Sequence, residues 1–95
     1  MKSISIEELV EAMKTGAVIV DVRETDEYAG GHVPRAINIP LSELENHLTE
    51  IKDESYIICQ SGRRSMRACQ YLTNQGLQVV NVLGGTSAWI GQLEG

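Results

Sequence analysis

The chain has 95 residues, of which 42% are hydrophobic and 22% charged, and its formal net charge at pH 7 is -5. This length and composition predict one domain over residues 1–95 with its own core, and they argue against wholesale disorder. The acidic balance disfavours a general nucleic-acid or membrane-surface binder. No apolar run approaches the ~20 residues of a membrane span, and the start of the sequence lacks a signal-peptide pattern. We therefore expect a cytoplasmic protein.

Two hydrophobic periods alternate along the chain. Ser5 and Glu8 have the spacing of a capping box, which predicts a helix that ends in a left-handed turn at Gly16. Ser42 and Glu45 repeat this spacing and predict a second capped helix. In chain order, the expected elements are a helix from residue 6, a strand at 17–20, a helix at 25–29, a strand at 36–39, a helix after residue 42, a strand at 56–58, a helix from near residue 63 to a C-cap at Gly76, a strand at 77–82, a turn at 84–85 and a short helix capped by Thr86.

Strands that alternate with helices predict a parallel sheet covered on both faces. The two cysteines are too few for a disulfide framework, and the chain has neither the cysteine spacing nor enough histidines for a zinc site. We therefore expect no structural metal. Cys69 lies on the apolar stripe of its predicted helix with Met66 and Leu72, which favours a place in the core.

Cys59 is the first residue after a predicted buried strand, and the helix that begins near Arg63 directs its free N–H groups at it. The helix dipole and the nearby guanidinium groups favour a thiolate over a thiol. Gly62 allows the backbone to fold tightly, so that successive amides form an anion-binding nest. The pattern indicates a nucleophilic cysteine for covalent chemistry on an anionic or sulfur-bearing substrate. The alternative is that Cys59 is a small buried hydrophobe that ends a strand.

At this loop the sequence resembles a known family, the rhodanese-type sulfurtransferases. The resemblance extends over nearly the whole chain in order. Its loop is made by Cys59, Gln60, Ser61, Gly62, Arg63, Arg64 and Ser65; the other matching segments are residues 21–24 (DVRE), 27–28 (EY), 31–34 (GHVP), 36–40 (AINIP), 83–85 (LGG) and 88–89 (AW). Arg35 departs from the pattern, because the family commonly has glycine after Pro34, and this change affects a turn or the charge of the rim.

The resemblance implies a three-layer α/β/α sandwich around a central, mostly parallel five-stranded sheet. It also implies that a Cys59 persulfide carries a sulfane sulfur, that residues 60–65 bind the anionic donor, and that Asp21 and Arg23 brace the site. Arg63 and Arg64 are our candidates for holding the anionic end of the donor. Proton transfer by Asp21 stays open. No metal and no organic cofactor is implied. The implied partners are thiosulfate or a persulfide donor and a thiol acceptor, either a small molecule or a thioredoxin-like protein.

Two other functions remain as alternatives. A docking or thiol-redox sensing module would keep this fold without catalysis. Cysteine phosphatases and arsenate reductases use a C-x5-R loop, whereas Arg64 closes a C-x4-R loop here and Ser65 occupies the other position. The shorter loop suits one added sulfur better than a tetrahedral phosphate.

Overall fold

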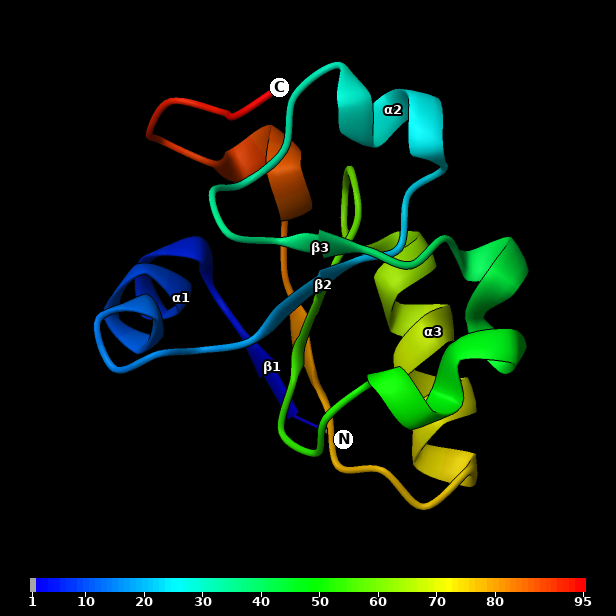
Figure 1. The fold of residues 1–95 in the computed structure, drawn as a ribbon. Helices are drawn as coiled ribbons and strands as arrows, with labels where there is room; N and C mark the ends of the chain where they lie inside the picture. The colour runs from blue at the N-terminus through cyan, green and yellow to red at the C-terminus, as the bar shows by residue number, and fades with distance from the viewer. Residues whose placement is uncertain (1) are drawn as a thin grey trace.

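The computed structural model describes residues 2–95 and contains one five-stranded sheet with the strand order β1-β5-β4-β2-β3 (Figure 1). Every neighbouring pair of strands is parallel. The strands are β1 (Lys2–Ile4), β2 (Ile19–Asp21), β3 (Ile37–Asn38), β4 (Tyr56–Ile58) and β5 (Val80–Val82); the helices are α1 (Ile6–Met13), α2 (Thr25–Ala29) and α3 (Arg63–Asn74), with 3₁₀ segments η1 (Leu41–Glu50) and η2 (Gly85–Ala88). The expected α/β fold is confirmed.

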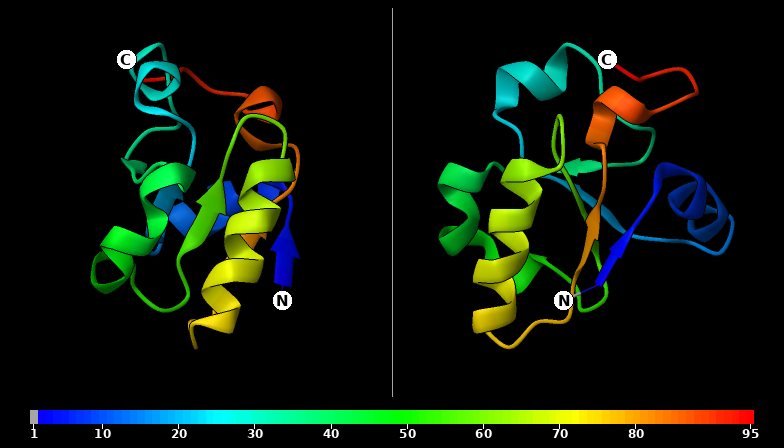
Figure 2. Two further views of the ribbon diagram at one scale, coloured as in Figure 1. Left: turned by 90° about the vertical axis from the view of Figure 1, so that its right-hand side faces the viewer. Right: turned by 180° about the vertical axis from the view of Figure 1, so that it is seen from behind.

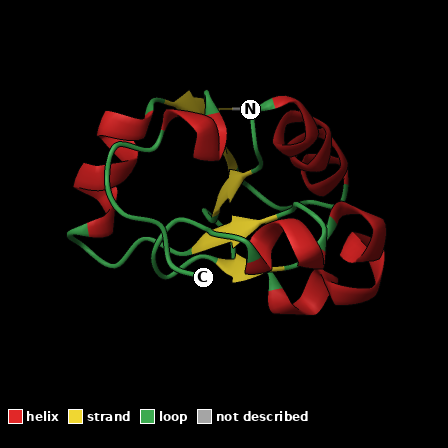
Figure 3. Ribbon diagram, turned by 90° about the horizontal axis from the view of Figure 1, so that it is seen from above, coloured by secondary structure: helices red, strands yellow, loops and turns green. Residues whose placement is uncertain are grey.

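Helices cover both faces of the sheet, as Figures 1 and 2 show. The helix α1 lies on one face, and α3 and η1 lie together on the other. Side chains of adjacent strand residues point to opposite faces. Ile19 and Ile58 accordingly belong to the core on the α1 side, whereas Val20 and Ile57 belong to the core under α3 and η1. The view from above in Figure 3 shows the strands running between these two helical layers.

The first helix begins as its sequence predicts. The Glu8 amide donates to Ser5 Oγ at 3.2 Å, and the Ser5 amide donates to Glu8 Oε1 at 3.0 Å. These bonds satisfy donors that a helix N-terminus otherwise leaves free. Gly16 follows the helix with a φ of +87°, so the expected left-handed turn is present.

The second predicted capping box is wrong. Residues 41–50 form 3₁₀ turns that begin after Pro40 and contain a non-helical residue at His47. Ser42 Oγ donates instead to both carboxylate oxygens of Glu24, at 3.1 and 3.2 Å. The hydroxyl expected to cap its own helix therefore joins η1 to the start of α2.

Three further predictions differ from the structure. The strand β1 was not among the elements expected from the sequence. The strands at 17–20 and 77–82 begin later than expected, at Ile19 and Val80. Thr86 lies inside η2 rather than capping a helix, and its hydroxyl donates to the Cys59 carbonyl at 3.2 Å.

Arg35 has a φ of +71°, a left-handed conformation that L side chains rarely adopt. Glycine tolerates this conformation without a Cβ clash, which explains why a glycine suits this turn. The Arg35 guanidinium lies against the end of α1, where Nη1 donates to the Met13 carbonyl at 3.4 Å. Arginine here therefore strains one turn of the backbone, and its charge lies beside α1.

Within residues 2–95, no helix combines the length and the apolar character needed to cross a bilayer.

Candidate active site

The candidate nucleophile lies where β4 ends and α3 begins. Cys59 directly follows β4, and three residues later Gly62 precedes α3 with a φ of +102°. This turn brings the Gly62 amide to Cys59 Sγ at 3.1 Å. In Figures 1 and 2 the loop rises from the carboxyl end of β4 toward α2 and η2. The turn that the sequence predicted thus places a backbone donor on the sulfur.

The surroundings of Cys59 favour its ionised form. The residue is 1% exposed, and burial alone would raise the pKa of its thiol. The Ser65 hydroxyl and the backbone amides of Ser65, Gly62 and Ser61 outweigh this, so the pKa lies below the ordinary value of 9.0. The direction agrees with the sequence argument, and its main causes are hydrogen-bond donors.

A glycine turn supports the loop from behind. The Thr86 amide donates to the Cys59 carbonyl at 2.8 Å, and the Ser87 amide donates to the Gln60 carbonyl at 3.0 Å. A Cβ on Gly85 would lie 2.7 Å from the Gln60 carbonyl oxygen and still closer to that of Cys59. Only glycine allows the two backbone segments to approach so closely. The Gly84-Gly85 pair was predicted as a turn, and the structure adds its contact with the loop.

Asp21 and Arg23 lie beside the loop and are buried. Arg23 Nη2 donates to Asp21 Oδ2 at 2.9 Å and to the Gly31 carbonyl at 2.7 Å, while Nη1 donates to Gln60 Oε1 at 3.3 Å. The Asp21 carboxylate also accepts the Arg23 amide at 2.9 Å. These bonds connect the end of β2 to the side chain of Gln60.

The two arginines at the start of α3 have different surroundings. Arg63 is exposed to solvent, whereas Arg64 donates from Nη1 and Nη2 to the two oxygens of Glu27, at 2.6 and 2.9 Å. The Arg64 hydrogen bonds lower the pKa of Glu27 to about 2, and the Glu27 hydrogen bonds raise that of Arg64. Sequence reasoning left Glu27 outside the site. Glu27 belongs to a segment that resembles the family pattern, beside Tyr28, but this position did not indicate that Glu27 pairs with Arg64.

Ser65 links the sulfur to a residue that the sequence analysis missed. The Cys59 thiol donates to Ser65 Oγ at 3.4 Å, and Ser65 Oγ donates to Asn81 Oδ1 at 2.6 Å. Ser65 and Asn81 are both fully buried. A carboxamide between Val80 and Val82 in a central strand is unusual. This polar residue in an apolar strand could have indicated a role for Asn81.

A model of the family described as "Rhodanese-like domain" matches residues 5–92. The chain belongs to the rhodanese-like family. It is 43% identical over 76 residues to the "Putative sulfurtransferase YtwF" of Bacillus subtilis, covering 78% of this chain and 74% of that protein. It is 41% identical over 75 residues to a protein of Allochromatium vinosum named "Sulfurtransferase", covering 76% of this chain and 70% of that protein.

Solved structures agree with this membership. The crystal structure of SSP1007 from Staphylococcus saprophyticus has a TM-score of 0.92 and 38% identity, and the match covers all of both chains. The rhodanese-like fold is thus shown by both sequence and structure, and the names of the relatives support sulfur transfer as the general function.

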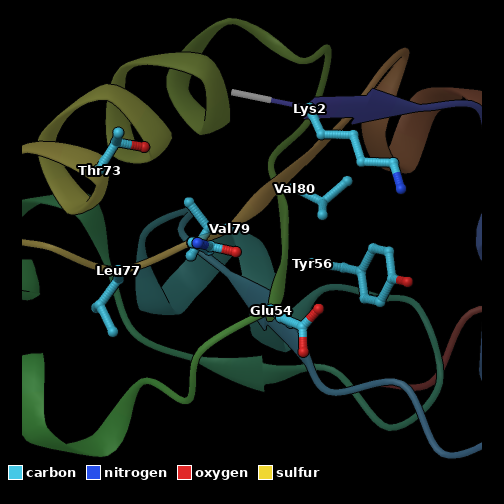
Figure 4. Close-up of a pocket in the computed structure, with 8 residues that line it drawn as sticks. Lys2, Glu54, Tyr56, Thr73, Leu77, Val79 and Val80 are labelled. Atoms are coloured by element: carbon cyan, nitrogen blue, oxygen red, sulfur yellow. The ribbon is translucent and has the colours of Figure 1, made fainter.

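The rhodanese-like domain also has a depression of about 710 Å³ at the other end of its sheet (Figure 4). Lys2, Tyr56 and Val80 line it, and these residues begin β1, β4 and β5, whereas Cys59 follows the far end of β4. Over residues 2–95, no three His, Cys, Asp or Glu side chains are grouped as metal ligands.

Neither cysteine lines this depression. The candidate nucleophile therefore lies at the opposite end of β4 from this depression.

Proposed function

We propose that this rhodanese-like chain moves a sulfane sulfur from a donor such as thiosulfate to a thiol or cyanide, with Cys59 as the carrier. The observation that supports this most is the 3.1 Å hydrogen bond from the Gly62 amide to Cys59 Sγ, at the N-terminus of α3. A sulfur held in this way has a lowered pKa and is a ready nucleophile at neutral pH.

In the first half-reaction the Cys59 thiolate attacks the outer sulfur of thiosulfate. A bond forms between Cys59 Sγ and that sulfur, and the S–S bond of thiosulfate breaks. Sulfite leaves with the bonding electron pair, and Cys59 becomes a persulfide anion. The negative charge now lies on the outer sulfur, where the amide nest of the loop stabilises it as it would an oxyanion.

In the second half-reaction an acceptor thiolate attacks the outer sulfur of the persulfide. The new bond joins the acceptor to that sulfur, and the electron pair of the broken bond returns to Cys59 as a thiolate. Because Cys59 is only 1% exposed, a bulky acceptor reaches the outer sulfur more easily than Sγ itself. This order of events gives ping-pong kinetics.

Arg63 and Arg64 have different roles in binding the anionic donor. Arg63 is exposed at the start of α3 and is our candidate for holding the anionic end of thiosulfate. Arg64 is held by Glu27 through two hydrogen bonds, which fixes its guanidinium near the loop but neutralises part of its charge. A phosphatase loop would need its arginine at residue 65, where this chain has Ser65.

The test is to incubate the protein with thiosulfate and to measure its intact mass. We expect one added sulfur atom, which cyanide removes. The Cys59→Ser variant loses this adduct, and the matched variant Cys69→Ser keeps it. Sulfur found on Cys69 would overturn the assignment of the carrier. No adduct from thiosulfate or polysulfide would favour the non-catalytic docking or sensing module instead.

A further inference from the structure

The buried carboxamide of Asn81 is only half satisfied. Its Oδ1 accepts a hydrogen bond from Ser65 Oγ at 2.6 Å, while its Nδ2 has no partner among the described residues. Asn81 is fully buried, and an unpartnered buried N–H group is rare and costly. Such a group next to a reactive centre calls for a physical explanation.

The direction of the hydrogen bonds around Ser65 offers an explanation for the unpartnered Nδ2 of Asn81. With a neutral thiol, Cys59 donates a hydrogen bond to Ser65 Oγ at 3.4 Å, and the Ser65 hydroxyl donates in turn to Asn81 Oδ1. A thiolate has no proton to donate. If the Ser65 hydroxyl kept pointing at Asn81, its oxygen lone pairs would face the negative sulfur. The bond chain must therefore reverse when the sulfur becomes charged.

We propose that Asn81 is a positioning residue for the reactive sulfur: its carboxamide turns over when Cys59 is ionised, so that Nδ2 donates to Ser65 Oγ and the Ser65 hydroxyl donates to the sulfur. The two ends of a carboxamide have nearly the same shape, so the turn needs no repacking. The unpartnered Nδ2 is the donor kept for this second state.

No proton crosses Asn81 in this exchange. The thiol proton of Cys59 passes to solvent water, the Ser65 hydroxyl keeps its proton and changes its direction, and the carboxamide only rotates. Asn81 touches Ser65 and acts on the sulfur through it. The inference rests on the proposed function only in taking Cys59 as the nucleophile, and a hydrogen bond to a charged group is stronger than one to a neutral group.

The first test compares two Asn→Asp substitutions. An ionised carboxylate at residue 81 accepts but cannot donate, so it holds the Ser65 hydroxyl away from the sulfur. We expect Asn81→Asp to raise the pH midpoint of iodoacetamide labelling at Cys59 and to slow labelling at pH 7 more than about tenfold. The control Asn74→Asp makes the same change at an exposed site at the end of α3, and it should alter the rate less than about twofold.

A double substitution separates this effect from simple charge repulsion. In a Ser65→Ala background the intermediary is gone, so Asn81→Asp should slow labelling less than about threefold further. An undiminished effect would overturn the proposal, because the added charge alone would then explain it. A lower melting temperature with an unchanged midpoint in Asn81→Asp would also overturn it, since that outcome marks a purely structural residue.

The wild-type protein offers a test that needs no substitution at residue 81. We expect one of the two side-chain amide proton resonances of Asn81 to move downfield in NMR spectra as Cys59 ionises, while those of Asn74 stay in place. Resonances of Asn81 that ignore the Cys59 titration would refute the turnover. None of these measurements uses a sulfur donor. Their outcome therefore tests the role of Asn81 independently of whether the protein transfers sulfur.

Discussion

The two cysteines lie in the same core cluster, yet their surroundings act on them in opposite ways. Cys59 and Cys69 are 1% and 0% exposed, and both face the core under α3. Burial raises the pKa of Cys69 to about 12, and the charge of Cys59 adds to this effect. At Cys59 burial acts in the same direction, but hydrogen-bond donors reverse it and lower the pKa.

The comparison shows that burial does not decide the reactivity of a thiol in this fold. The loop after β4 and the first turn of α3 direct the amides of Ser61, Gly62 and Ser65 at the sulfur of Cys59. In the middle of α3, the amides are used by the helix itself and have no free donor for Cys69. The start of a helix therefore activates a cysteine, whereas its interior keeps one inert.

The largest expected difference between the cysteines is their rate of alkylation. At pH 7 a thiol with a pKa of about 12 is ionised in roughly one molecule in 10⁵, whereas one below 9.0 is ionised in more than about one in 100. We expect iodoacetamide to label Cys59 at least about 10³-fold faster than Cys69. Peptide mass spectrometry of the native protein, with the unfolded protein as the control, measures both rates. Equal native rates would contradict the comparison.

Substitution of Gly85 should remove much of the advantage of Cys59. A Cβ there would overlap the carbonyl groups of Cys59 and Gln60, so the loop must move away from its present position. We expect Gly85→Ala to destabilise the fold by about 3 kcal/mol and to slow labelling of Cys59. Urea unfolding and the labelling rate measure the two effects.

Gly76 provides the matched control. Its φ of +93° is, like the +58° of Gly85, positive and strained for alanine, but a Cβ on Gly76 meets nothing within 4 Å. We expect Gly76→Ala to cost about 1 kcal/mol and to leave labelling of Cys59 unchanged. If both variants slowed labelling equally, the contact behind the loop would not be what holds the sulfur in place.

Features encoded within a few residues were predicted from the sequence, and those that need distant partners were not. The capping box of Ser5 and the turn at Gly62 are local, and both are present. The hydroxyl of Ser42 has its partner 18 residues away, so its spacing to Glu45 led to the wrong prediction of a capping box. The partners of Arg64 and Ser65 lie 37 and 16 residues away, brought near by the parallel strand order rather than by any local spacing.

The same reasoning makes Glu27 a test of how a distant partner affects the loop. The pKa of Glu27 is about 2 in the folded protein, below its ordinary value of 4.5. A lowered folded pKa means that the carboxylate stabilises the fold fully above pH 4.5 and that this contribution is lost as the pH falls toward 2. Both side chains of the pair are 35% exposed, so we expect about 1 kcal/mol after solvent screening.

Glu27→Gln should therefore lower the free energy of unfolding at pH 7 by about 1 kcal/mol, and the difference from wild type should vanish near pH 2. Glutamine retains an oxygen for the Glu24 amide, which donates to Glu27 Oε1 at 3.1 Å, so the start of α2 is preserved. Removal of this negative charge also leaves Arg64 free to attract the Cys59 thiolate, which should lower the pH midpoint of Cys59 labelling slightly. Asp26→Asn, an exposed neighbour in the same helical turn, is the control for loss of charge alone. A difference that persisted unchanged down to pH 2, or an equal effect of Asp26→Asn, would show that the ion pair with Arg64 is not its source.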